Sequence, residues 1–183
     1  MPTFEPCLPP GSASKRTNVV ARHGAAGMAT AALLLVTLGA APARAAMLSQ
    51  SVDVNASPAE VWALVGPYCA IETWLPPIGS CRLDDKTPPT RTLVTKDRAA
   101  TFVELETERN DASRFYSYTF LSSPLPVRDY RSTIRVTSSG NGGSTVIWRS
   151  EYRPEPGREK EALDTLTTVY RAGLDSIASR FAR

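Results

Sequence analysis

The stretch that decides the fold is "REKEALDTLTTVYRAGLDSIASRFA", residues 158–182 at the end of the chain. In this stretch, charged residues such as Lys160, Arg171 and Asp175 are interspersed with regularly spaced apolar residues, so that a helix would have one charged face and one apolar stripe. The stripe recurs at three- and four-residue steps, as on one face of an α-helix; it comprises Leu163, Leu166, Val169, Tyr170, Gly173, Leu174, Ile177 and Phe181. We therefore expect one long helix that buries this stripe against another layer.

Six segments before this helix have the composition of β-strands and are separated by short polar turns. They are "GSCRLDD", "TRTLVTKD", "ATFVELETE", "RFYSYTFLSS", "RDYRSTIRVTS" and "STVIWRSEYR". The clearest turn is "SSGNGGS" (138–144), since glycine and asparagine accept the backbone conformations of a tight hairpin. Successive strands joined by turns this short indicate an antiparallel meander.

One further strand and two short helices are expected upstream. "MLSQSVDVN" (47–55) alternates as an opening strand. In "NASPAEVWALVG", Ser57 is the expected N-cap, Pro58 takes the first helical position and Glu60 completes a capping box. A shorter helix within "YCAIETWLPPIG" ends before its two prolines. This order predicts an α+β helix-grip fold, in which a curved antiparallel sheet of about seven strands surrounds the long helix and leaves a cavity.

Residues 1–45 have the features of a cleavable signal peptide. Three basic residues precede the apolar run "AAGMATAALLLVTLGAA" (25–41), and "APARAA" follows it. Ala43 and Ala45 occupy the small-x-small positions that signal peptidase favours, so we expect cleavage after Ala45. The run has 17 residues, at the low end for a membrane span, so an uncleaved anchor is the less favoured alternative. The domain over 46–183 is expected in the periplasm or outside the cell, with no stable membrane span.

The charge of this domain argues against a nucleic-acid partner. Four of the 21 basic residues and one of the 18 acidic residues lie in 1–45, which leaves 17 of each and a nearly neutral domain. The single histidine, His23, also lies in the leader. A domain without imidazole excludes Ser-His and Cys-His nucleophile pairs and histidine metal sites. We predict no catalytic residue, metal site or cofactor.

The domain has two cysteines, Cys69 and Cys81. In an oxidising compartment a pair at this spacing can form a disulfide; the alternative is two buried small apolar side chains. The sequence leaves both open, because the geometry of a disulfide is not visible in it.

Three stretches resemble the START-like (SRPBCC) superfamily, particularly its bacterial polyketide cyclase/dehydrase and lipid-transport group: "SPAEVWALVGPYCAIETWLPPIGSC", "RFYSYTFLSSPLPVRDYRSTIRV" and "STVIWRSEY". The chain is similar, more distantly, to the plant abscisic-acid receptors, in the distance from its Val-Trp pair to Ser80-Cys81. Leu75 stands where those receptors have a lysine for the hormone carboxylate, and "KDRA" (96–99) replaces their gate loop. The resemblance implies the helix-grip fold but not one activity, since the superfamily includes carriers, receptors and enzymes.

By this resemblance, the loop "SPLPVRDY" closes over the mouth of the cavity as a lid spanning 122–132. Leu125, Pro126 and Val127 would then be lid residues, while Tyr130 and Ser132 would point toward the ligand. The charged residues of the loop are interpreted as a solvated hinge, because exposed ion pairs contribute little; they are Arg128, Asp129 and Arg131.

Aromatic residues are expected to form one wall of the pocket. Tyr116, Tyr118 and Phe120 alternate on one strand face, and the receptors' pocket residues fall on the two tyrosines. The alternative is an aromatic core under the terminal helix. Trp74, beside Leu75, is placed at the pocket mouth, and Val169 of the long helix is added to the ligand-binding set.

The orientation of strand 144–153 stays open between two registers. In one, Arg149 faces the ligand and needs an anionic partner; in the other, Arg149 is exposed and Trp148 is buried. Glu104, Glu106 and Glu108 share one strand face by alternation, and we interpret that face as a wet outer surface.

Three functional hypotheses follow. The first is an exported, non-enzymatic binding protein that holds a small hydrophobic molecule, such as a lipid, isoprenoid or polyketide-like compound, between sheet and helix. The second is a cyclase or dehydratase in which tyrosine hydroxyls and Arg149 stabilise an enolate. The third is an accessory protein that docks on a periplasmic enzyme and has a packed core and an exposed apolar patch. The sequence specifies no protein partner.

Overall fold

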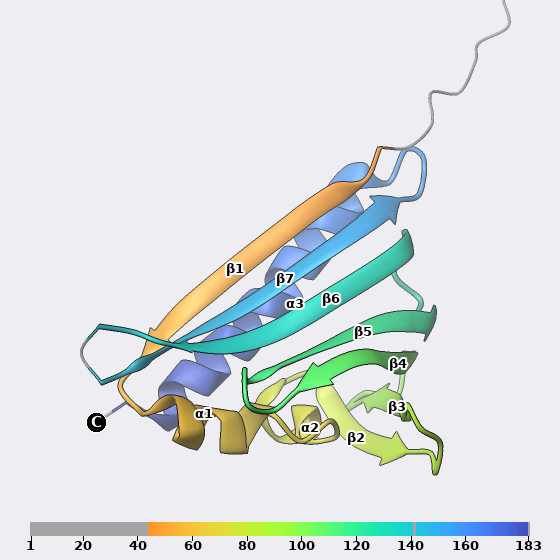
Figure 1. Cartoon of the computed structure of the whole chain (residues 1–183). Coiled ribbons are helices and arrows are strands. Elements are labelled where there is room, and N and C mark those ends of the chain that lie inside the picture. The colour runs from red at the N-terminus through yellow and green to blue at the C-terminus, as the bar shows by residue number, and fades with distance from the viewer. Residues whose placement is uncertain (1–43, 141, 183) are drawn as a thin grey trace, which may run out of the picture. The chain divides into compact units, whose positions relative to one another are not determined.

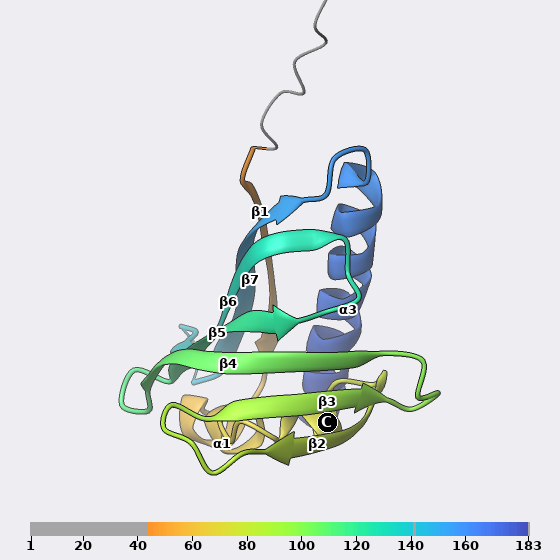
Figure 2. The same cartoon turned by 90° about the vertical axis from the view of Figure 1, so that its right-hand side faces the viewer.

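The computed structural model describes residues 44–140 and 142–182. The predicted leader, apart from its last two residues, lies outside the described residues. Seven strands form one antiparallel sheet in the order β1-β7-β6-β5-β4-β3-β2, and helix α3 lies along the face around which the sheet curves (Figures 1 and 2). The predicted helix-grip fold is confirmed.

The elements follow the predicted order. The strands are β1 (Ala46–Val54), β2 (Ile78–Leu83), β3 (Thr90–Thr95), β4 (Thr101–Asn110), β5 (Phe115–Ser122), β6 (Val127–Ser138) and β7 (Ser144–Pro154). The helices are α1 (Pro58–Val65), α2 (Ile71–Trp74) and α3 (Glu159–Arg180). Among the described residues, no helix is both long and apolar enough to cross a membrane.

Helix α1 begins with the predicted capping box. The backbone N–H of Glu60 donates to Ser57 Oγ at 3.3 Å, and the N–H of Ser57 donates to the Glu60 carboxylate at 2.9 Å. Each contact satisfies a donor that the first helical turn leaves without a backbone partner. The cap fixes where β1 gives way to the two short helices that lead to β2 (Figure 1).

The core lies between α3 and the concave face of the sheet. The inward residues of α3 are Ala162, Leu166, Tyr170, Gly173, Leu174 and Ile177. Leu163, which the sequence places in the apolar stripe, is 44% exposed, and Ala162 is buried instead. Strand β7 contributes Val146, Trp148 and Tyr152 to the core by regular alternation.

A β-bulge divides strand β4. Its pairing with β5 shifts register between Glu106 and Glu108, so one extra residue is accommodated there. Glu104 and Glu106, before the bulge, are buried on the inner face, and the extra residue places Glu108 on the other face, where it is exposed. The prediction that the three glutamates share a wet outer face is wrong. Simple alternation does not hold across a bulge, and Glu104 and Glu106 are buried in ion pairs with Arg91 and Arg109.

Candidate functional site

A pocket of about 190 Å³ lies among α2, α3 and the inner face of the sheet. Most of its lining is apolar, and the charged exception is Glu104. The lining residues are Ile71, Leu75, Pro77, Ile78, Leu93, Thr95, Phe102, Glu104, Tyr118, Phe120, Leu125, Tyr130, Trp148, Thr165, Leu166, Val169 and Tyr170. An apolar hollow with a few polar groups is the usual form of a small-molecule site.

Half of the predicted ligand-binding residues line this pocket: Leu75, Tyr118, Phe120, Leu125, Tyr130 and Val169. The other predicted residues do not line the pocket. Trp74, predicted at the pocket mouth, is instead buried in the core, as is Tyr116. Ser132 is hydrogen-bonded to Tyr170 and does not line the pocket. Pro126 and Val127 are buried or half-buried but do not line the pocket.

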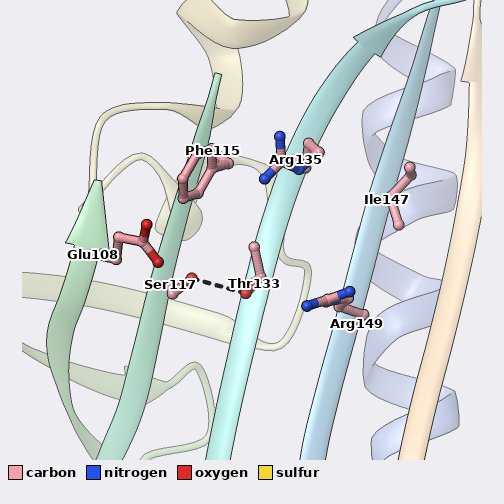
Figure 3. A pocket seen from close by; sticks show the side chains of 7 residues that line it. All are labelled: Glu108, Phe115, Ser117, Thr133, Arg135, Ile147 and Arg149. Atoms are coloured by element: carbon pink, nitrogen blue, oxygen red, sulfur yellow. Dashed lines mark hydrogen bonds between the residues drawn. The ribbon is translucent and has the colours of Figure 1, made fainter. Parts of the chain in front are cut away.

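Arg149 is a predicted site residue that the structure places on the other face of the sheet. Trp148 is buried and Arg149 is exposed, so β7 adopts the second of the two registers left open by the sequence. The Arg149 side chain lies on the outer face of the sheet (Figure 3), in a separate hollow of about 240 Å³ that also contains Glu108 and the hydrogen-bonded Ser117–Thr133 pair. The physical reason is burial: indole packs well in an apolar core, while an unpaired guanidinium does not.

The loop after β5 is shorter than the predicted lid. Strand β5 ends at Ser122 and β6 begins at Val127, so residues 127–132 belong to a strand. Within 123–126, Leu125 lines the pocket. Asp129 adopts a positive φ of 51° and forms an exposed ion pair with Arg153 at 3.5 Å, in the solvated setting expected for the charged hinge.

Hydroxyl groups form a chain beside the pocket. Tyr170 Oη lies 2.7 Å from Tyr130 Oη and 3.0 Å from Ser132 Oγ. Trp148 Nε1 donates to Ser132 Oγ at 2.9 Å and, more weakly, to Tyr118 Oη at 3.2 Å. The indole of Trp148 is stacked on Tyr170, with centroids 4.1 Å apart. These contacts hold three tyrosine hydroxyls in fixed positions next to an apolar space.

Burial keeps these hydroxyls protonated. It raises the pKa values of Tyr118 and Tyr130 well above the ordinary value of 10.0, and raises the pKa of Tyr170 to about 12. At neutral pH the tyrosines are therefore hydrogen-bonding groups and not bases.

An ion pair that the sequence did not predict lies under the pocket. Arg91 Nε donates to Glu104 Oε2 at 2.6 Å, with the two side chains 0% and 5% exposed. The guanidinium also donates to the backbone oxygen of Tyr68 and lies over the rings of Tyr68 and Tyr118, 4.1 and 4.9 Å from their centroids. The aromatic faces and the carboxylate together stabilise the buried cation.

The two partners influence each other's proton affinity. Burial raises the pKa of Glu104, although the attraction and hydrogen bond of Arg91 act in the opposite direction. Burial alone would lower the pKa of Arg91, but Glu104 and the surrounding tyrosines hold it above its ordinary value. The pair is ionised, because the 2.6 Å contact between Arg91 Nε and Glu104 Oε2 has the short length of a hydrogen bond between charged groups. The sequence did contain one indication that Arg91 is buried. Residues two positions apart on a strand face the same side, so Arg91 faces the same side as the buried Leu93.

Cys69 and Cys81 are joined in a disulfide, with Cα atoms 5.5 Å apart. The bond connects the segment before α2 to strand β2. Because α2 and β2 both contribute pocket residues, the disulfide restrains one side of the pocket. Within the part of the chain that the structure describes, no cluster of three or more His, Cys, Asp or Glu side chains is suited to hold a metal ion.

Comparisons with known proteins agree with this architecture. The family model described as polyketide cyclase / dehydrase and lipid transport matches residues 45–182. A search among curated proteins gives no match. The solved structure of the protein XoxI from Bacillus cereus is 31% identical, with a TM-score of 0.70, and covers 74% of this chain and 95% of its own.

Two further solved structures are similar. A protein from Thermobifida fusca is 28% identical with a TM-score of 0.66, covering 74% of this chain and 92% of its own. The Zhui aromatase/cyclase from a Streptomyces species is 13% identical with a TM-score of 0.64, covering 75% and 93%, and shows likeness of fold alone. On the family match and the similarity to XoxI, the chain belongs to the polyketide cyclase/dehydrase and lipid-transport family of the SRPBCC group.

Proposed function

We propose that this protein binds a small hydrophobic molecule in the pocket between the sheet and α3, without transforming it. The observation that carries the proposal is the lining itself, which combines aliphatic and aromatic side chains with a few fixed hydroxyls. Burial of an apolar ligand there is favoured by roughly 25 cal/mol per Å² of apolar surface, before ordering costs. Membership of a family described as including lipid transport supports the same function.

The size of the pocket favours a compact ligand. An apolar cavity of about 150 Å³ admits benzene, and this pocket measures about 190 Å³. One or two rings therefore fit, whereas a lipid with two acyl chains would require the pocket to open. Among the ligand classes proposed from the sequence, a small isoprenoid or polyketide-like ring compound is the best match.

The catalytic alternative has less support. It used Arg149 to stabilise an enolate, and that side chain is exposed on the outer face of the sheet. The remaining polar groups of the pocket are protonated tyrosines and a glutamate paired with Arg91. The pocket likewise weighs against an accessory protein with a fully packed core.

We also propose that the domain acts outside the cytoplasm. The signal-peptide features of residues 1–45 support export. The Cys69–Cys81 disulfide is compatible with an oxidising compartment.

The test is native mass spectrometry of the protein isolated from its own source, followed by extraction and identification of whatever is bound. A neutral compound of one or two rings in stoichiometric amount is the expected result. A chemically converted product released during incubation with that compound would instead favour the enzyme.

A further inference from the structure

The hydroxyl chain beside the pocket has one allowed direction of donation, and this has a consequence for the ligand of the proposed function. Ser132 Oγ lies 3.0 Å from the backbone oxygen of Arg149, and a carbonyl can only accept. The single hydrogen of Ser132 is thereby used. Tyr170 must then donate to Ser132 at 3.0 Å, and Tyr130 must donate to Tyr170 at 2.7 Å.

Tyr118 is different from the other two tyrosines. Its oxygen accepts a hydrogen bond from Trp148 Nε1 at 3.2 Å, but its own hydrogen has no acceptor among the described residues. The residue is 1% exposed and lines the pocket. A buried donor without a partner is unfavourable, so an acceptor that enters the pocket and meets this O–H is favoured.

Glu104 supplies the second constraint. Its carboxylate lines the same pocket, and Arg91 neutralises it from the side of the core. A ligand carboxylate would be placed beside a buried negative charge, whereas the Arg91 guanidinium does not line the pocket. The pocket therefore disfavours acidic ligands.

We propose that Tyr118 is the specificity-determining donor of the pocket and that the ligand is a neutral ring compound bearing a hydrogen-bond acceptor, of the ketone or quinone class. The carbonyl oxygen accepts the free O–H of Tyr118 while the rings lie among the apolar side chains. This inference rests on the proposed function and adds to it the polar group that the ligand carries.

The experiment compares three probes of similar size by isothermal titration calorimetry. 1-Tetralone carries the acceptor, tetralin has no polar atom, and 1,2,3,4-tetrahydro-1-naphthoate replaces the ketone by a carboxylate. Wild-type protein should bind 1-tetralone roughly two- to tenfold more tightly than tetralin, the range of one neutral hydrogen bond, and the carboxylate more weakly than either.

Tyr118→Phe removes the donor and keeps the ring. The variant should lose the preference for 1-tetralone over tetralin while tetralin binding is retained. Tyr152→Phe is the matched control, because Tyr152 is buried on β7 and does not line this pocket; it should keep the preference. The infrared carbonyl stretch of bound 1-tetralone should shift to lower frequency in wild type and in the control, and return toward its apolar-solvent position in Tyr118→Phe.

The outcomes separate the two proposals. If tetralin binds but wild type shows no preference for the ketone, or Tyr118→Phe keeps the preference and the infrared shift, the inference about Tyr118 is wrong and the apolar pocket remains. If none of the three probes binds, the proposed function fails and the inference fails with it.

Discussion

Arg91 and Glu104 show how much the character of the pocket depends on two charged side chains. A buried ion pair contributes little net stability, because desolvation offsets most of the attraction. Removing only one of the two partners has a larger effect, because the other charge is then left buried without compensation. Three tyrosine rings surround the guanidinium, so Arg91 has no path to water when its partner is lost.

Glu104→Gln should therefore lower the free energy of unfolding by about 3–5 kcal/mol, the usual effect of breaking a buried pair. Urea denaturation followed by circular dichroism measures this value. Glu161→Gln, which disrupts an exposed pair with Arg158, is the control and should change stability by at most about 1 kcal/mol. Similar, small effects of both substitutions would mean that the Arg91–Glu104 pair is solvated.

At the scale of the elements, the contact of α3 with the sheet depends on a position without a side chain. A Cβ atom on Gly173 would lie 2.8 Å from Trp148 Cζ3, 3.1 Å from Leu75 Cδ1 and 3.2 Å from Trp74 Cζ3. Two of these neighbours are indole rings packed edge to face, which cannot move independently. The absence of a side chain at Gly173 thus allows α3 to pack closely against Trp148, Leu75 and Trp74.

Gly173→Ala should destabilise the protein, although alanine is the better helix former by about 1 kcal/mol. Overpacking costs typically about 1–3 kcal/mol, and we expect it to exceed the gain in propensity. The comparison is with Ala172→Gly in the same helix, which should cost about 0.5–1 kcal/mol through propensity alone. A higher melting temperature for Gly173→Ala would show that α3 is not held this tightly.

Features of the elements that depend on local chemistry can be predicted from the sequence, whereas features that depend on strand pairing cannot. Capping at Ser57, the order of the elements along the chain and most of the α3 stripe follow from local chemistry, and these were predictable. The bulge in β4 depends on pairing with β5, so the separation of Glu108 from Glu104 and Glu106 was not predictable. The burial of Glu104 depends on Arg91, which comes from the neighbouring strand β3. The register of β7 was predictable in principle. Val146, Trp148 and Tyr152 are separated by even numbers of residues and so face the same side of the strand, which places Arg149 on the opposite, exposed side. The pocket depends on side chains from eight helices and strands, which no local pattern defines.

For the whole molecule, the tyrosines determine the response to alkali. All six tyrosines have pKa values raised above 10.0, with burial as the largest cause in each case. A group whose pKa is raised in the folded state makes its full contribution to the free energy of unfolding when the pH is below its pKa in the unfolded chain. That contribution is lost as the pH rises through the folded pKa.

Stability should accordingly fall above pH 10, and phenolate absorbance should appear only as the protein unfolds. Parallel titration of absorbance at 295 nm and far-ultraviolet circular dichroism checks this. The two curves should coincide and lie above the curve of the urea-unfolded protein, which titrates near 10.0. Ionisation of several tyrosines near pH 10 with unchanged dichroism would contradict their burial.

The claim that the pocket binds an apolar ligand is tested most directly by fluorescence titration with 1-aminonaphthalene, a neutral two-ring probe. Wild-type protein should bind one probe molecule. Val169→Phe places a larger side chain in the pocket and should weaken binding roughly tenfold or more. Leu163→Phe, on the exposed side of the same helix, should bind as wild type does. Absence of binding to wild type, or equal binding by both variants, would contradict a ligand site between the sheet and α3.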